Sequence, residues 1–131
     1  MLNYKAMLKI KLSIPFLFFT ALITFNACKH DSPVPEGPTV SFNEHVKPII
    51  IGNCTAPECH PAAGGEFPLV SYNDVIKNGE IKEGNGKDSE LIKVLKETND
   101  SERMPPPPSA PLTSNQIQII ELWVAQGAKN N

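Results

Sequence analysis

The stretch CTAPECH, residues 54 to 60, brings together side chains that could do chemistry. Cys54 and Cys59 are five positions apart, and His60 follows the second cysteine directly. Two thiols and an imidazole this close together can form a disulfide, ligate a metal ion, or attach and ligate a covalent cofactor. Each of these possibilities makes a different demand on the rest of the chain.

Zinc and a disulfide are the two simpler explanations. Structural zinc requires four nitrogen or sulfur ligands, and His45 supplies one more at best. Adjacent Cys59 and His60 would also be strained on one tetrahedral ion, so zinc is the least favoured explanation. A disulfide between Cys54 and Cys59 suits an exported protein. However, it closes only a small loop, stabilises little, and leaves His60 without a role.

Haem c is the third explanation, because its attachment signature is C-x-x-C-H. Each thiol forms a thioether with one vinyl group of the haem, and the histidine becomes the proximal iron ligand. Here the spacer TAPE is two residues longer than usual, and C-x4-C-H is a known variant. A six-coordinate haem also needs a second axial ligand, for which methionine or histidine serves.

Met104, in the stretch RMPPPP, is the only methionine beyond the N-terminal segment. The prolines after it predict an extended, stiff polyproline loop that presents the thioether. The alternative is a proline linker that contains a methionine by chance. We interpret the neighbouring Arg103 as a solvated loop charge.

The N-terminal segment is typical of an export signal. Three lysines precede the apolar stretch SIPFLFFTALITF, which has signal-peptide length. The segment ends in FNAC, which resembles the lipobox of bacterial lipoproteins. We therefore expect residues 1–27 to be a lipoprotein signal peptide and Cys28 to be the lipid attachment site. An ordinary signal peptide with an incidental cysteine is the alternative. Either interpretation places the chain in the cell envelope, on the periplasmic side, and acylation would anchor it to the membrane.

Composition then limits the partners. Residues 28–39 are polar and proline-rich, which predicts a flexible tether, and residues 40–131 are long enough for one domain. Three of the twelve basic residues and none of the fourteen acidic ones precede Cys28, so the mature net charge is −5. An acidic domain without a basic stripe excludes nucleic acid as a partner.

A domain of this size has a marginal core, so we expect it to fold poorly without a stabilising group.

Apolar periodicity and capping residues predict an all-α domain. Helices are expected over residues 41–50, 71–79, 88–97 and 113–127. Ser41 with Glu44, and Thr113 with Gln116, have capping-box spacing. Gly79 and Gly127 are placed to end helices. We expect Pro48 to kink or shorten the first helix, and the glycines and charges of GGEF and EGNGK argue against strands.

Four stretches follow one another along the chain: SFNEHVKPIIIGNCTAPECH, SYNDV, RMPP and PLTSNQIQIIELWVAQGA. In this order they resemble a small class I cytochrome c, of the monohaem kind found in exported bacterial proteins. The resemblance covers nearly the whole domain. It implies an all-α fold in which the first and last helices cross around one covalent haem c. It also implies that Cys54 and Cys59 bind the haem, that His60 is the proximal ligand and that Met104 is the distal ligand.

The resemblance implies two further properties. Phe42 or Val46 of the first helix would pack against Ile120 or Trp123 of the last helix. The protein would be a one-electron carrier rather than an enzyme, and it would exchange electrons with redox partner proteins as a monomer or as a subunit of a redox complex. Its acidic surface suggests a partner with a basic docking patch.

Two alternatives remain open at this point. One is a haem peroxidase or gas sensor in which the Met104 ligand dissociates. The other is a haem-free envelope lipoprotein closed by a disulfide between Cys54 and Cys59.

Overall fold

The computed structural model describes residues 37–131. The predicted signal peptide, the predicted lipid attachment site Cys28 and the predicted tether up to residue 36 lie outside the described residues. Between residues 37 and 131 all regular secondary structure is helical. The all-α prediction is therefore confirmed for this part of the chain. None of its helices is long and apolar enough to cross a membrane.

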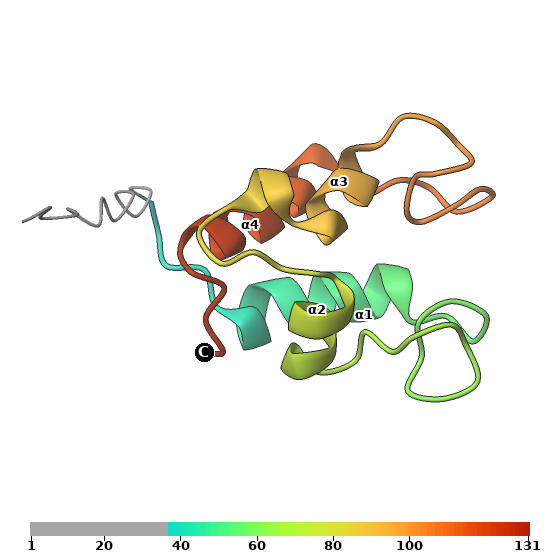
Figure 1. The fold of residues 1–131 in the computed structure, drawn as a ribbon, viewed down its shortest axis with the longest axis horizontal. Coiled ribbons are helices and arrows are strands. Elements are labelled where there is room, and N and C mark those ends of the chain that lie inside the picture. Colours follow the sequence, from blue (N-terminus) through green and yellow to red (C-terminus); the bar gives the residue numbers. More distant parts are fainter. Residues whose placement is uncertain (1–36) are drawn as a thin grey trace, which may run out of the picture. The chain divides into compact units, whose positions relative to one another are not determined.

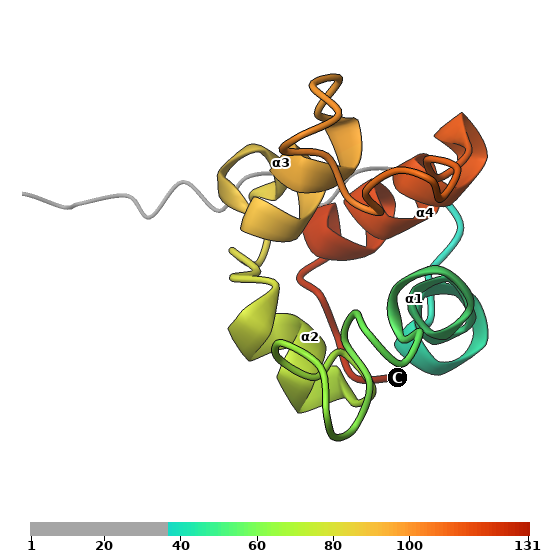
Figure 2. The same ribbon diagram turned by 90° about the vertical axis from the view of Figure 1, so that its right-hand side faces the viewer.

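The described elements are η1 (Phe42–Val46), α1 (Lys47–Cys54), α2 (Tyr72–Asn78), η2 (Gly86–Asp88), α3 (Glu90–Lys96) and α4 (Ser114–Ala125). In Figures 1 and 2, α3 and α4 form one side of the domain, and α1 and α2 form the other. The two long loops, residues 55–71 and 97–113, lie at the same end of the domain (Figure 1). The segment with which the described chain begins lies at the opposite end.

An aromatic cluster joins the first helical turn to the last helix. The rings of Phe42 and Trp123, both buried, have centroids 5.4 Å apart. The ring of Tyr72 meets both edge-on, at 5.3 Å and 6.4 Å. The hydroxyl of Tyr72 donates to the main-chain oxygen of Ala128, and the indole N–H of Trp123 donates to that of Lys129, each at 2.9 Å. The predicted contact between the first and last helices is confirmed.

Most helix ends lie where the sequence predicts them. Thr113 and Gln116 form a complete capping box at the start of α4, and so do Ser71 and Asp74 at the start of α2. Gly79 caps the C-terminal end of α2. Gly127 follows α4 with a φ of +93°, a conformation that glycine adopts without strain. In α3 the predicted apolar residues are buried: Leu91, Ile92 and Leu95.

The predicted capping box at Ser41 is only half formed. Its hydroxyl accepts from the amide of Glu44 at 3.2 Å, but its own amide donates to Nδ1 of His45 at 3.0 Å. The first turn is a π-helix, closed by the amide of Val46 on the oxygen of Ser41. This wider winding accounts for His45, rather than Glu44, meeting the Ser41 amide. His45 is exposed, in agreement with its interpretation as a surface residue.

Pro48 was expected to kink or shorten the first helix, and it does not shorten it. It lies at the start of α1, where a missing N–H costs little, and the helix continues to Cys54. The change in winding falls directly before it, in η1. As a result the helix delivers Cys54 to the loop end of the domain.

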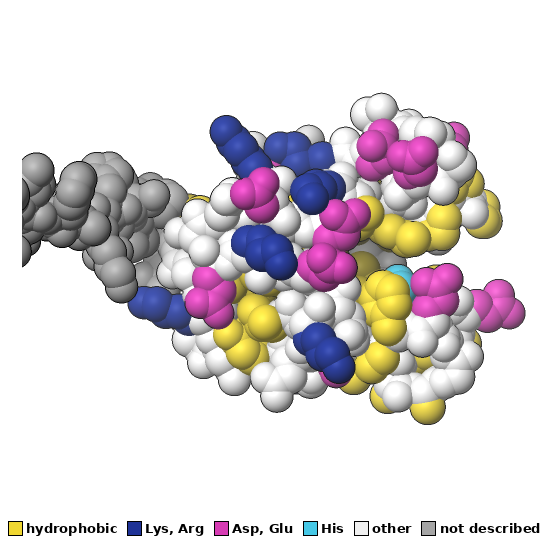
Figure 3. Space-filling model, viewed as in Figure 1, with side chains coloured by type: hydrophobic (Ala, Val, Ile, Leu, Met, Phe, Trp, Pro, Cys, Tyr) yellow, Lys and Arg dark blue, Asp and Glu magenta, His cyan; other side chains and the backbone are white. Residues whose placement is uncertain are grey.

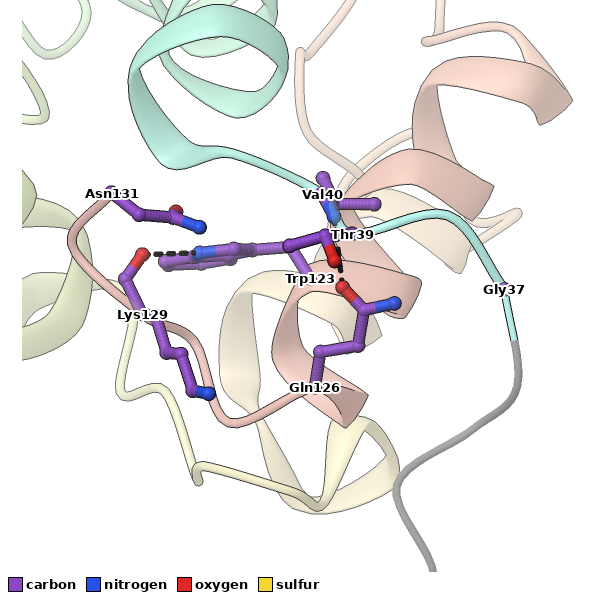
Figure 4. A pocket seen from close by; sticks show the side chains of 7 residues that line it. All are labelled: Gly37, Thr39, Val40, Trp123, Gln126, Lys129 and Asn131. Atoms are coloured by element: carbon purple, nitrogen blue, oxygen red, sulfur yellow. Dashed lines mark hydrogen bonds between the residues drawn. The ribbon is translucent and has the colours of Figure 1, made fainter.

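Residues 37–39, the last part of the predicted tether, run along α4 (Figure 4). The side-chain amide of Gln126 donates to the main-chain oxygen of Pro38 at 3.0 Å and accepts from the amide of Val40 at 2.9 Å. Around it lies a hollow of about 140 Å³ that Trp123 and Lys129 also line. This contact fixes where the chain enters the domain.

Candidate cofactor site

An apolar cleft opens between the two long loops. Its walls include Leu69, Leu91 and Leu95, and its enclosed volume is about 110 Å³. Figure 3 shows the hollow between the two loop regions, with hydrophobic side chains along both rims. Three of the residues selected from the sequence line this cleft: Cys54, His60 and Met104.

A smaller hollow of about 20 Å³ adjoins the cleft and shares three lining residues with it. Its lining includes all four predicted cofactor residues: Cys54, Cys59, His60 and Met104. The structure therefore brings these four side chains together, although Met104 comes from a different loop. Of the predicted site residues, Cys28 lies outside the described part of the chain.

The longer spacer between the cysteines turns outward. The amide of His60 donates to the main-chain oxygen of Cys54 at 3.0 Å, and the amide of Cys59 donates to that of Ala56 at 2.9 Å. Residues 56–58 are exposed between these two bonds. Because the additional residues loop out, the main-chain groups of Cys54 and His60 still form a hydrogen bond with each other.

Both cysteines are free thiols in this structure. Burial, followed by the charge of the nearby Cys59, raises the pKa of the Cys54 thiol to about 11. Burial therefore favours the protonated thiol of Cys54 over its thiolate. Among residues 37–131, no three histidine, cysteine or acidic side chains lie close enough together to hold a metal ion. The second finding disfavours structural zinc, which takes four ligands.

The loop that follows His60 orients its imidazole. The side chain of His60 is 7% exposed, and its Nδ1 lies 3.0 Å from the main-chain oxygen of Phe67. Because a carbonyl oxygen can only accept, we assign the proton to Nδ1. This tautomer leaves the lone pair of Nε2 available to a metal. The Phe67 ring stacks on the imidazole with centroids 4.3 Å apart.

Several bonds fold this loop back on itself. The amide of Leu69 donates to the main-chain oxygen of His60 at 3.0 Å, and Nδ2 of Asn78 donates to that of Pro68 at 2.8 Å. Gly65 approaches the main chain so closely that an added Cβ would collide with the oxygen of Cys59 and the ring of Pro61. The loop conformation therefore requires glycine at this position.

Met104 is anchored to α3 and clamped by its neighbour. Its amide donates to the main-chain oxygen of Val94 at 2.9 Å. The guanidinium of Arg103 donates to Asp100 at 2.7 Å, to the main-chain oxygen of Ser109 at 3.1 Å, and to that of Pro105.

The interpretation of Arg103 as a solvated charge is therefore wrong, since its side chain is only 12% exposed. The physical reason lies in the composition of the loop. Its prolines have no N–H group, so the loop is short of donors for its own carbonyl oxygens. Arginine carries five donors in a planar group and supplies two of these bonds.

The stiff polyproline conformation predicted for RMPPPP is also wrong. The amide of Ser109 donates to the main-chain oxygen of Pro106 at 3.0 Å, which closes a turn. Met104 is held by Val94 and Arg103 rather than by the stiffness of a straight run.

Sequence reasoning missed the residues that support His60. Phe67 and Asn78 are 7 and 18 positions after it, and neither belongs to a motif with it. The only signal was an aromatic residue in a loop otherwise rich in glycine and alanine. Leu69, Leu91 and Leu95 were not identified as cleft walls either, because apolar residues do not reveal which cavity they line.

Comparison of the chain with protein-family models, with curated proteins and with solved structures finds no match. The fold and the cleft define a small helical domain whose apolar cleft carries two thiols, an imidazole and a thioether.

Proposed function

We propose that this chain is a small cytochrome c-like protein, a one-electron carrier with one haem c attached through Cys54 and Cys59. His60 would be the proximal iron ligand and Met104 the distal one. The observation that carries this proposal is that all four side chains line one hollow, although they come from two loops and a helix end.

The set of donor atoms fits haem c. Two thiols would form the thioether links, an imidazole with a free Nε2 would ligate the iron, and methionine sulfur would complete the coordination. The apolar walls suit a macrocycle. The enclosed volume is below the roughly 300 to 1,000 Å³ of typical small-molecule pockets, so attachment would require the two loops to part at the mouth of the cleft.

Haem c, when bound, supplies an iron that changes its oxidation state by one electron. The contribution of the chain is to fix its surroundings. The Phe67 carbonyl holds the Nδ1 proton of His60, which fixes the ring and raises the basicity of Nε2. Leu91 and Leu95 line one side of the cleft with apolar side chains that would exclude water from a bound haem.

A carrier is favoured over a haem enzyme by what surrounds Met104. With His60 and Met104 both as ligands, no coordination position remains for oxygen or peroxide. An enzyme would also need a polar group free to act on a bound oxidant. Arg103, the neighbouring cation, is bound to Asp100 and to two main-chain oxygens of its own loop.

The proposal extends to the location of the protein. Cleavage before Cys28 and acylation of its thiol would anchor the carrier by lipid to a membrane of the cell envelope. It would act there as a monomer or as a subunit of a redox complex.

Mass spectrometry and a pyridine haemochrome spectrum test the proposal on the full chain produced with the haem-attachment machinery. We expect a mass increase of one haem and the spectrum of a thioether-linked haem. The double variant Cys54→Ser, Cys59→Ser should lack both. Colourless protein with the mass of the unmodified polypeptide would refute the proposal, and a mass lower by two hydrogens would indicate the disulfide alternative.

A further inference from the structure

We propose that the mouth of the cleft is the docking face for a redox partner protein whose own contact face is basic. This inference rests on the proposed function and names the partner class for the same cleft. It arises from how charge and apolar surface are distributed over the described residues.

The net charge of the described chain lies entirely on the two loops that border the cleft. Residues 55–71 and 97–113 together carry five carboxylates and one arginine, a net charge of −4. The carboxylates are those of Glu58, Glu66, Glu97, Asp100 and Glu102. The remaining residues between 37 and 131 contain seven acidic and seven basic side chains, a net charge of zero. The domain is therefore electrically polar, with its negative end at the cleft.

This negative charge faces solvent. Glu58 and Glu66 on one loop, and Asp100 and Glu102 on the other, are exposed. Figure 3 shows carboxylates on both sides of the hollow, while the lysines gather elsewhere. Arg103, the one cation of these loops, is largely buried against its own loop and offers little positive charge to a partner.

Exposed apolar surface lies between the two acidic rims. Phe67 is 41% exposed, and Pro106, Pro107 and Pro108 are exposed on the opposite loop. A dry apolar centre within a polar rim is the usual anatomy of a protein–protein contact. Because the Phe67 ring stacks on His60, a partner that covers Phe67 would be one ring away from the proposed iron ligand.

The negative charge of the two loops determines which kind of partner face can dock here. Rims of one sign accelerate association with an oppositely charged face and suppress association with a similarly charged one. A basic partner face satisfies the carboxylates of both loops at once. An acidic partner face would be repelled by the carboxylates that border the cleft.

A titration with pentalysine, which stands in for a basic contact face, tests this inference by nuclear magnetic resonance on the full chain labelled with nitrogen-15. At low salt, we expect amide shifts to concentrate in residues 55–71 and 97–113 and to vanish as salt is added. The rim variant Glu58→Lys, Glu66→Lys, Glu102→Lys should weaken the affinity on the order of tenfold or more.

The matched control is Glu44→Lys, Glu80→Lys, Glu83→Lys, which changes the net charge equally at three exposed carboxylates outside the two loops. We expect it to change the affinity by less than about twofold. Equal weakening in both triple variants, or wild-type shifts spread evenly over the domain, would overturn the docking face. If the rim variant does not fold, the location and salt dependence of the wild-type shifts still decide the question.

Haem content is measured on the same samples and separates the two proposals. Protein without haem whose shifts still concentrate at the cleft would refute the carrier and retain the acidic docking face. Haem-loaded protein whose shifts do not concentrate at the cleft would retain the carrier and refute the acidic docking face.

Discussion

Nδ1 of His60 lies 3.0 Å from the main-chain oxygen of Phe67, and the rings of the same two residues stack at 4.3 Å. Phe67 therefore restrains the imidazole of His60 through two contacts, one from its carbonyl oxygen and one from its ring. This arrangement exists only because the chain folds back between residues 60 and 69. The bonds that hold this loop are therefore the first to test.

Asn78 supports the loop from α2. Replacement by alanine removes the donor to the main-chain oxygen of Pro68, next to Phe67. We expect the free energy of unfolding, measured in urea, to fall by about 1 to 3 kcal/mol. Hydrogen exchange at the Leu69 amide should accelerate at the same time. Asn73→Ala, at an exposed position of the same helix, should change stability by less than about 0.5 kcal/mol. Equal losses in both variants would contradict a role for Asn78 in holding the loop.

The two glycines Gly65 and Gly52 should respond oppositely to alanine. A Cβ at Gly65 would collide with Cys59 and Pro61, so the loop must shift and stability must fall. Gly52 lies in α1 with no atom within 4 Å of such a Cβ, and alanine there should stabilise the domain by about 0.5 to 1 kcal/mol. Thermal unfolding of both variants measures the difference, and a tolerated Gly65→Ala would show that the loop has room to rearrange.

Arg103→Gln should loosen the loop that presents Met104. The change removes a charged group that is 12% exposed and bound to two main-chain oxygens and to Asp100. We expect the free energy of unfolding to fall by about 1.5 to 3 kcal/mol and hydrogen exchange over residues 97–113 to become faster. Lys93→Gln breaks only an exposed ion pair with Glu90 and should cost at most about 1 kcal/mol. Unchanged exchange in Arg103→Gln would exclude the clamp.

Met104→Ala tests the distal ligand of the proposed haem. The reduced wild-type protein should show little spectral change with carbon monoxide, because both axial positions are occupied by side chains. The variant should bind carbon monoxide readily. Thr98→Ala, an exposed change in the same loop, should behave as the wild type does. Strong binding of carbon monoxide by the wild-type protein would instead favour the sensor or peroxidase alternative.

The buried thiol predicts a pH dependence for whatever folded population the chain retains without haem. Its pKa is raised from the ordinary value of 9.0 to about 11. The folded state therefore retains the Cys54 proton between these values, whereas the unfolded state loses it. Stability is fully present below pH 9 and should fall as the pH rises towards 11, by about 2 to 3 kcal/mol in total.

Urea unfolding across this range measures the slope, and Cys54→Ser should lack it. A chain with haem attached should lack it too, because a thioether sulfur has no proton to lose. Identical slopes in the unmodified wild type and in Cys54→Ser would show that Cys54 does not control this dependence.

Local patterns in the sequence determined the helices. Capping residues and apolar spacing act within one or two turns, so the ends of α2 and α4 and the buried face of α3 could be predicted correctly. The predictions that failed were decided by contacts that are equally short in sequence but depend on the exact backbone conformation. His45 took the place of Glu44 at the first cap, and Arg103 binds carbonyl oxygens of a proline run that was expected to be straight.

The sequence by itself determined which side chains could do chemistry: the two thiols, the following imidazole and the one methionine. Only the tertiary structure decided that Met104 shares a hollow with the other three, that Phe67 orients His60, and that the negative charge gathers at the cleft. The physical reason is the range of the interactions. Residue types and short spacings are read along the chain, whereas a cleft is made when loops distant in sequence meet across a packed core.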